Sequence, residues 1–119
     1  MNLSCAVDVV GDRATVTPVG DVAAESTYLL RDAIQVAMTR PEIDSVVVDL
    51  SEVTFLDSSA LGVLVVARKS CHQRGLAFGV RDPGPMVTMV LRITGLFDQL
   101  TVADHGSTGP ASASPVAPV

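Results

Sequence analysis

Two short hydrophobic segments open the chain and are separated by a tight turn. Residues 3–10 and 13–19 are rich in Val and Thr, and Gly11-Asp12 lies between them. β-Branched residues on either side of a Gly-containing dipeptide are typical of a β-hairpin. A third segment, residues 45–50, reads Ser-Val-Val-Val-Asp-Leu. A β-branched run of this kind is typical of a central strand that is covered on both faces.

Three further segments carry the spacing of helices. In residues 24–40, apolar residues recur four positions apart and line one face: Leu29, Leu30, Ala33, Ile34, Ala37 and Met38. Pro41 disfavours helical backbone at the residue before it and so ends this helix. After a connection at residues 51–57, residues 58–74 and 86–94 are predicted to be the second and third helices. Each is followed by a glycine that suits a helix C-cap.

The order of the predicted elements selects the fold class. Short strands at residues 76–81 and 100–103 follow the second and third helices. The order ββαβαβαβ implies right-handed crossovers between parallel strands. We therefore expect a single α/β domain over residues 1–104, with a mixed, mostly parallel sheet, an N-terminal antiparallel hairpin and helices packed on the sheet. Residues 105–119 are rich in Pro, Gly, Ser and Ala, and a disordered tail is predicted there.

The composition narrows the classes of function. The chain has 119 residues, of which 48% are hydrophobic and 3% aromatic, and its formal net charge is −5. The chain has neither a run of basic residues nor enough aromatic residues to stack on bases, so nucleic acid is not expected as a partner. The longest apolar run, residues 60–67, is far shorter than the roughly 20 residues of a membrane-spanning helix. No N-terminal signal sequence is recognisable, so we expect a cytoplasmic protein without a membrane partner.

The two cysteines, Cys5 and Cys71, are too few for a disulfide scaffold, and reduced thiols suit the cytoplasm. Buried, unreactive thiols are the favoured interpretation. The alternative is a redox-sensitive pair, which would require the two Cα atoms to lie within about 7 Å of each other.

Three consecutive polar residues, Asp57-Ser58-Ser59, stand where the second helix begins. Each suits an N-cap, because a side-chain oxygen there accepts hydrogen bonds from the free N–H groups of the first turn. Capping needs only one of them, so the others are candidates for chemistry. A serine hydroxyl at a helix start is an exposed acceptor for a phosphoryl group. A phosphate would add a charge of about −1.5 to −2 and lie favourably at the positive end of the helix dipole.

The apolar run that follows, residues 60–67, covers every direction around the helix axis. A single stripe facing the core therefore cannot account for all of it. We expect Leu61, Leu64 and Val65 to face the core. The remaining side chains either form a partner-facing patch or lie under the first helix: Val63, Val66 and Ala67.

Catalytic constellations are not found. His72 lies fourteen positions from Ser58 along one predicted helix, a distance of roughly 21 Å. The two side chains are therefore too far apart to form a catalytic Ser-His pair. There is no glycine-rich phosphate loop with its lysine. The adjacent Cys71 and His72 lack the spacing of metal ligands. We therefore expect no enzymatic activity, no metal and no cofactor.

These segments together resemble a known family. The run Asp57-Ser58-Ser59-Ala60-Leu61-Gly62, preceded by the strand at residues 46–50 and followed by Gly95-Leu96-Phe97, looks like the STAS domain of bacterial anti-sigma factor antagonists. The resemblance covers about residues 3–103 and matches the predicted order of elements.

The resemblance implies an anti-anti-sigma factor, a regulator of transcription in partner switching and stress response. Its unphosphorylated form would bind an anti-sigma factor and so release a sigma factor. The anti-sigma factor is typically a serine kinase that phosphorylates the first serine of the motif, here Ser58, and a serine phosphatase reverses the modification. Ser59 is the second candidate for the phosphate. The implied partner-binding residues are Asp21, Asp57, Ser58, Ser59, Ala60, Gly62, Val63 and Val66.

Two positions depart from the family pattern. Many relatives carry Gly at the position of Ala60 and Asp at the position of Ala23, where Asp21 is a nearby carboxylate that could substitute. Two other functions stay open: a non-switching STAS scaffold in a larger signalling complex, and a STAS module that binds a small ligand. The oligomeric state is also open, with a monomer among the alternatives.

Overall fold

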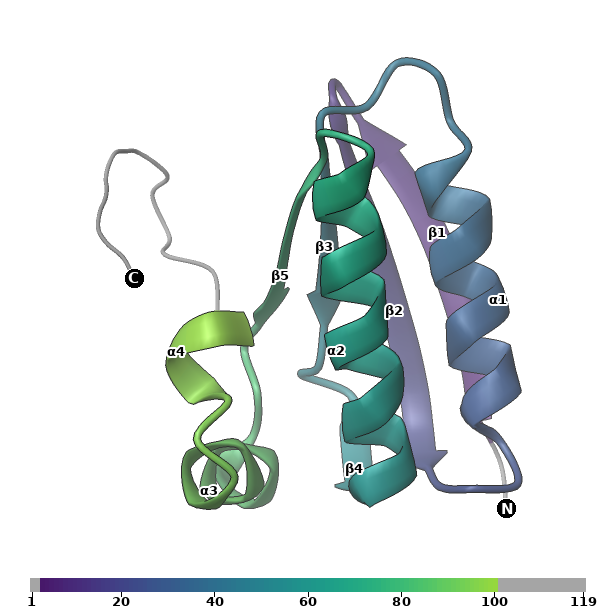
Figure 1. The fold of residues 1–119 in the computed structure, drawn as a ribbon. Coiled ribbons are helices and arrows are strands. Elements are labelled where there is room, and N and C mark those ends of the chain that lie inside the picture. Colours follow the sequence, from purple (N-terminus) through teal and green to yellow (C-terminus); the bar gives the residue numbers. More distant parts are fainter. Residues whose placement is uncertain (1–2, 101–119) are drawn as a thin grey trace.

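The structure is a computed structural model and describes residues 3–100. In this part of the chain, five strands form one sheet. The strands follow the order β1-β2-β3-β5, and β4 pairs with β2 (Figure 1). Their bounds are β1 Leu3–Val10, β2 Arg13–Val22, β3 Ser45–Asp49, β4 Val53–Leu56 and β5 Ala77–Arg81.

The strand pairings begin with an antiparallel hairpin. β1 and β2 pair along their length, from Leu3 opposite Gly20 to Val10 opposite Arg13. Gly11 closes the hairpin with a φ of 61°, a conformation that glycine adopts without strain. The other pairings are parallel: β3 lies beside the first half of β2, β4 beside its end, and β5 beside β3. The expected mixed, mostly parallel sheet with an N-terminal hairpin is confirmed.

Helices α1 and α2 lie side by side on one face of this sheet (Figure 1). α1 packs on β1 and β2, whereas α2 packs on β5 and against α1. α3 contacts β4, and α4 contacts β5. The bounds are α1 Thr27–Met38, α2 Ser58–Gln73, α3 Pro85–Ile93 and α4 Phe97–Leu100. Among residues 3–100, these helices are all too short or too polar to cross a membrane.

The core lies between the sheet and the two long helices. Successive side chains of a strand point to opposite faces, so alternate residues of each strand enter the core. Val16 of β2, Val48 of β3 and Val80 of β5 share one face and are fully buried. Leu30 of α1 and Leu64 of α2 are fully buried as well. The core is therefore aliphatic and is completed from both helices.

Two parts of the predicted secondary structure are wrong. Residues 51–57, expected to be a connection, contain the strand β4. This strand forms by pairing with β2, which is distant in the sequence, and the four residues of β4 show no alternation that would predict it. Leu100, the first residue of the expected last strand, ends α4 instead, and its N–H donates to the Leu96 carbonyl at 3.0 Å. Residues 101–103 and the predicted tail at 105–119 lie outside the described residues.

Helix α1 begins at Thr27, later than the hydrophobic spacing predicts. The residues ahead of it form a turn around the buried side chain of Ser26, whose hydroxyl accepts a hydrogen bond from the N–H of Ala23 at 3.1 Å. The turn also uses the Ala23 carbonyl, which accepts from the N–H of Ser26 at 2.8 Å. These contacts fix the conformation of the loop between β2 and α1.

Candidate functional site

Asp57 is the N-cap of α2 and the most connected polar side chain at the candidate site. Its Oδ1 accepts the backbone N–H of Ala60 at 3.0 Å and the hydroxyl of Ser59 at 2.6 Å. Its Oδ2 accepts the backbone N–H of Ala24 at 3.0 Å, from the loop between β2 and α1. One carboxylate therefore caps a helix and ties a second loop to it.

The backbone reinforces this junction. The N–H of Asp57 donates to the carbonyl of Val22 at 3.2 Å, as β4 leaves the sheet beside β2. Because β2 and β4 are parallel, their carboxyl ends meet at one end of the sheet. That geometry brings residues 23–26 and the start of α2 together, although more than thirty positions separate them in the sequence.

The hydrogen bonds also keep Asp57 ionised. The Ser59 hydroxyl is the largest cause that lowers the pKa of Asp57, and the N–H groups of Ala60 and Ala24 act in the same direction against a smaller opposing effect of burial. Hydrogen bonds to a carboxylate favour its charged form. A fixed negative charge therefore stands at the start of α2.

The two serines of the motif have different surroundings. The side chain of Ser59 is held by Asp57 through the 2.6 Å hydrogen bond. Ser58 is exposed, and its hydroxyl makes no hydrogen bond to any of residues 3–100. The Ser58 hydroxyl is therefore accessible to an incoming phosphoryl group, whereas that of Ser59 is engaged.

Asp21 lies in the same region but is occupied. Its Oδ1 accepts a short hydrogen bond from the hydroxyl of Thr54 on β4. Ala23, one of the two positions expected to depart from the family pattern, is buried. Thr54 and the buried Ser26 belong to this site and were not predicted from the sequence, because their contacts are with residues of other elements.

The apolar run of α2 divides between core and surface. Ala60, Leu61, Leu64 and Ala67 are buried, whereas Val65 is 40% exposed, so the prediction that Val65 faces the core is wrong. The reason is that the sheet lies on one side of α2 and Val65 points away from it. Ala60, a predicted partner-binding residue, is fully buried and offers no exposed surface in this structure.

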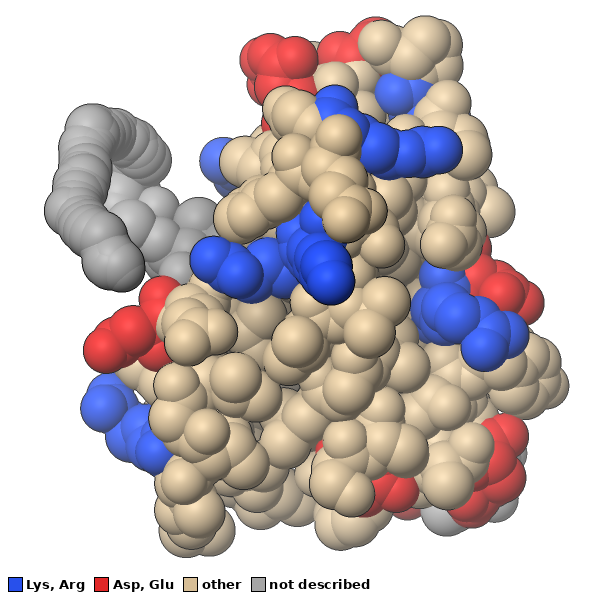
Figure 2. All heavy atoms as spheres, in the orientation of Figure 1, with Lys and Arg blue, Asp and Glu red and all other residues tan. Residues whose placement is uncertain are grey.

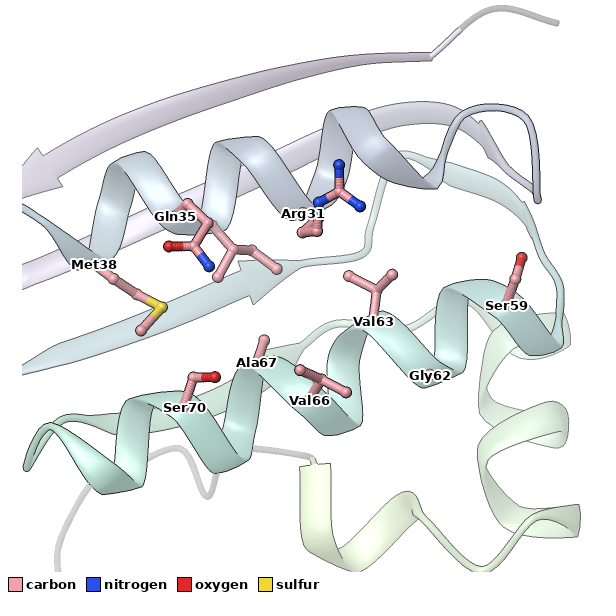
Figure 3. A pocket seen from close by; sticks show the side chains of 10 residues that line it. Arg31, Gln35, Met38, Ser59, Gly62, Val63, Val66, Ala67 and Ser70 are labelled. Carbon is pink, nitrogen blue, oxygen red and sulfur yellow. The ribbon is translucent and has the colours of Figure 1, made fainter.

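Gly62, Val63 and Val66 line a groove between α1 and α2, shown in Figure 3. The groove has a volume of about 350 Å³. Val66 is 63% exposed, so α1 does not cover it. Ala67 lies at the bottom of the groove and is 7% exposed, which matches the alternative in which α1 covers it. The groove starts at Ser59 and is thus continuous with the motif.

The two cysteines are free thiols on different elements, Cys5 on β1 and Cys71 on α2. Burial raises the pKa of Cys71 to about 11, and burial also raises that of Cys5. A raised pKa keeps a thiol protonated and poorly nucleophilic. These surroundings favour the interpretation of Cys71 as an unreactive core residue.

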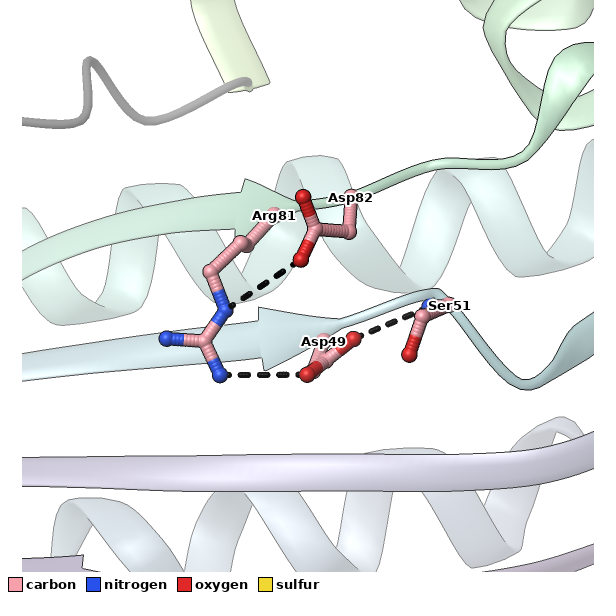
Figure 4. Close-up of polar contacts among 4 residues, drawn as sticks. All are labelled: Asp49, Ser51, Arg81 and Asp82. Carbon is pink, nitrogen blue, oxygen red and sulfur yellow. Dashed lines mark hydrogen bonds and ion pairs between the residues drawn. The ribbon is translucent and has the colours of Figure 1, made fainter.

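A second polar cluster lies on the face of the sheet that α1 and α2 leave open (Figure 4). Arg81 of β5 donates from Nη2 to Asp49 Oδ2 at 3.1 Å, and the backbone N–H of Ser51 donates to Asp49 Oδ1 at 2.9 Å. Burial raises the pKa of Asp49, but the hydrogen bonds from Ser51 and Arg81 outweigh it and lower the pKa overall. The cluster was not predicted, because only strand register places the two residues opposite each other.

Within residues 3–100, no three His, Cys, Asp or Glu side chains are close enough together to hold a metal ion. In the described part of the chain, the hydrogen bonds at the start of α2 involve the acidic N-cap Asp57, and no side chain is hydrogen-bonded to the Ser58 hydroxyl.

Comparison with known proteins places this geometry in context. A family model described as the STAS domain matches residues 5–108. An anti-sigma F factor antagonist from Paenibacillus polymyxa is 29% identical over 72% of this chain and 74% of its own length. An anti-sigma-B factor antagonist from Listeria monocytogenes is 31% identical over 76% of this chain and 79% of its own length.

Solved structures show the same fold. An anti-sigma factor antagonist from Mycobacterium paratuberculosis superposes with a TM-score of 0.76 at 23% identity and 88% coverage of both chains. The anti-sigma factor antagonist SpoIIAA in its unphosphorylated form superposes with a TM-score of 0.70 at 16% identity, covering 85% of this chain and 90% of that one. At these identities the likeness establishes the fold alone.

Proposed function

We propose that this chain, which belongs to the STAS domain family, is an anti-sigma factor antagonist that phosphorylation of Ser58 switches off. Its relatives from Paenibacillus and Listeria are named as antagonists of this kind. The unphosphorylated chain binds an anti-sigma factor in the cytoplasm and thereby releases a sigma factor. The binding surface is formed by the loop between β2 and α1 together with the start of α2.

The observation that carries the proposal is the contrast between the two serines. Ser58 follows the N-cap and is exposed with a free hydroxyl, whereas the hydroxyl of Ser59 is bound to Asp57 at 2.6 Å. A kinase must bring the attacking hydroxyl in line with the γ-phosphate, which is easier for a side chain that breaks no hydrogen bond within the domain when it moves. Ser58 is such a side chain.

Phosphorylation at this point changes binding without unfolding the domain. A phosphate carries a charge of about −1.5 to −2 and lies at the N-terminus of α2, where the helix dipole favours an anion. The phosphate also lies beside the ionised Asp57, so negative charge accumulates on the surface that the partner must cover. Desolvation of that charge and repulsion from acidic groups of the partner weaken the complex.

The proposal assigns the catalytic machinery to the partners. The anti-sigma factor acts as the serine kinase and supplies ATP, and a serine phosphatase removes the phosphate. This chain supplies the acceptor hydroxyl and the docking surface.

The test compares three variants of the full chain with the wild type: Ser58→Ala, Ser58→Asp and Ser59→Ala. We expect site-localised mass spectrometry of the protein from its native cells to place the phosphate on Ser58 in the wild type and in Ser59→Ala. Ser58→Ala should bind the co-purifying anti-sigma factor as the wild type does. Ser58→Asp should bind at least about tenfold more weakly, a change of roughly 1.4 kcal/mol in the free energy of binding.

Two outcomes would contradict the proposal. One is equal affinity of the anti-sigma factor for the wild type and its Ser58-phosphorylated form. The other is purification of the chain as a defined large assembly whose composition does not respond to phosphorylation, because that result would indicate a non-switching scaffold.

A further inference from the structure

The groove between α1 and α2 contains the predicted partner-binding residues Gly62, Val63 and Val66, and it also has the features of a small-molecule site. The two helices run side by side, and the side chains that point between them in Figure 3 include Met38 of α1 and Val63 and Ala67 of α2. The lining is mostly apolar, and the volume of about 350 Å³ falls in the range of small-molecule sites. An apolar side chain such as Val66, left 63% exposed, gains from contact with an apolar ligand.

The absence of a side chain at Gly62 widens the groove. Gly62 is an ordinary helical residue without a positive φ, and a Cβ placed there would meet no atom within 4 Å. Alanine is the better helix former, so neither the backbone nor the packing of residues 3–100 requires glycine at this position. The glycine leaves space for an atom that does not belong to the chain.

Arg31 is the single charged side chain among the ten that line the groove. Its Nε lies 3.5 Å from Oδ1 of the neighbouring Asp32, with both side chains more than half exposed. An exposed ion pair of this kind is weak and readily exchanged. The guanidinium can therefore donate two hydrogen bonds to the carboxylate of a ligand in a bidentate pair.

The charged residue of the groove lies toward one end, and apolar residues extend from it to the other end. Arg31 lies opposite Val63, near the start of α2, and Met38 lies opposite Ser70, toward its end (Figure 3). In the space-filling view, blue atoms of basic residues lie on both sides of a tan surface over α1 and α2 (Figure 2). α2 itself contains no Asp or Glu in its 16 residues. The basic side chains of this face favour an anion, and the carboxylate of a ligand would displace Asp32 from Arg31.

We propose that this groove binds one amphiphilic carboxylate, with the size and shape of a medium-chain fatty acid. The carboxylate pairs with Arg31, and the apolar chain runs over Val63, Val66 and Ala67 toward Met38. The site is distinct from the Ser58 hydroxyl and goes beyond the proposed switch.

The test is a titration of the full chain with sodium decanoate below its micelle concentration, followed by nuclear magnetic resonance of backbone amides and methyl groups. We expect saturable shifts confined to α1 and α2. Gly62→Leu should bind at least tenfold more weakly because the new side chain fills the groove. Val36→Leu adds a methylene on the exposed surface of α1 away from the lining, and it should bind as the wild type does.

Two further measurements address the charge and the fold. Arg31→Gln should weaken decanoate binding at least fivefold and leave the weaker binding of decanol unchanged. Thermal unfolding of Gly62→Leu checks that the variant is folded.

Three outcomes overturn the inference: unsaturable shifts spread over the whole chain, equal binding of decanoate by Gly62→Leu and the wild type, or tighter binding of decyltrimethylammonium than of decanoate. A fourth is loss of anti-sigma factor binding in Gly62→Leu without any decanoate binding by the wild type. That result would make the groove part of the protein interface and would leave the Ser58 switch standing.

Discussion

Asp57 connects the two loops that form the proposed docking surface. Its carboxylate accepts hydrogen bonds from Ala24, Ser59 and Ala60, so it acts as a helix cap and as a tether between distant parts of the chain. The same hydrogen bonds immobilise Ser59 and leave Ser58 free. At the scale of single residues, the proposed preference for Ser58 over Ser59 thus rests on which hydroxyl the cap holds.

The pKa of Asp57 tests this arrangement. In Ser59→Ala the largest cause of the lowered pKa is removed, so we expect the pKa of Asp57 to rise toward its ordinary value of about 3.9. Carboxyl-detected nuclear magnetic resonance across pH 2–6 measures the change. Ser58→Ala is the matched control and should leave the pKa of Asp57 unchanged. A similar shift in both variants would show that Ser59 does not hold the carboxylate.

Substitution of the cap itself tests the tether. Asp57→Ala should lower the free energy of unfolding by about 1–2 kcal/mol, because it leaves helix N–H groups without an acceptor. Asp57→Asn keeps one acceptor oxygen and so retains the cap, but its amide group cannot accept the N–H of Ala24. Asp57→Asn should therefore lower the free energy of unfolding by less than Asp57→Ala does. Urea unfolding gives both values, and an Asp57→Asn variant as stable as the wild type would argue against a tether distinct from the cap.

Helix α2 combines two roles along one element. Its first turn presents the serines, and its apolar run packs on the sheet through Leu64 while Val65 and Val66 stay at the surface. An apolar helix can thus serve the core and an interface at once. The local sequence does not reveal which residues face which way, because apolar side chains surround the axis.

The adjacent residues Leu64 and Val65 of α2 allow a buried and an exposed position to be compared by their effects on stability. Leu64→Ala removes a fully buried side chain and should lower the free energy of unfolding by about 2–5 kcal/mol. Val65→Ala removes a side chain that is 40% exposed and should change it by less than about 1 kcal/mol. Chemical denaturation with a common m-value gives the difference. Losses of similar size would mean that Val65 faces the core after all.

On the scale of the whole molecule, the sheet has a helix-covered face and an open face, and ionisable groups occur on both. Asp49 and Arg81 pair on the open face at 3.1 Å, while Asp57 and His72 belong to α2 and its cap. Burial lowers the pKa of His72, and the positive charge of Arg68 adds to the effect. The pKa values of Asp49, Asp57 and His72 are therefore all lowered in the folded state.

These shifts predict how stability depends on pH. A group whose pKa is lower in the folded state binds more protons in the unfolded chain, so acidification favours unfolding. The free energy of unfolding should decrease as pH falls through about 6.5, where His72 of the unfolded chain titrates, and again below about 4, where Asp49 and Asp57 do. Urea unfolding at pH 7.5, 5.5 and 3.5 measures both steps. His72→Gln should remove the upper step alone, and its persistence in that variant would contradict the assignment.

The candidate site was predictable in part. The polar triplet at a helix start indicated a cap and an exposed hydroxyl, because capping depends on a few neighbouring residues. The choice of Asp57 as the cap, the engagement of Ser59, and the roles of Thr54 and Ser26 depend on contacts between elements. The groove beside Gly62 also requires α1, which lies more than twenty positions away in the sequence.

The sequence by itself determined the hairpin, the central strand, the two long helices and the order of the α/β domain, because turns, β-branched runs and helical spacing are properties of neighbouring residues. Only the tertiary structure decided that residues 53–56 form β4, that Leu100 ends a helix, and that Val65 faces solvent. Each of these features depends on an element distant in sequence: β4 pairs with β2, α4 packs against β5 and α2, and α2 packs on the sheet. A local pattern does not indicate which of these elements will be near.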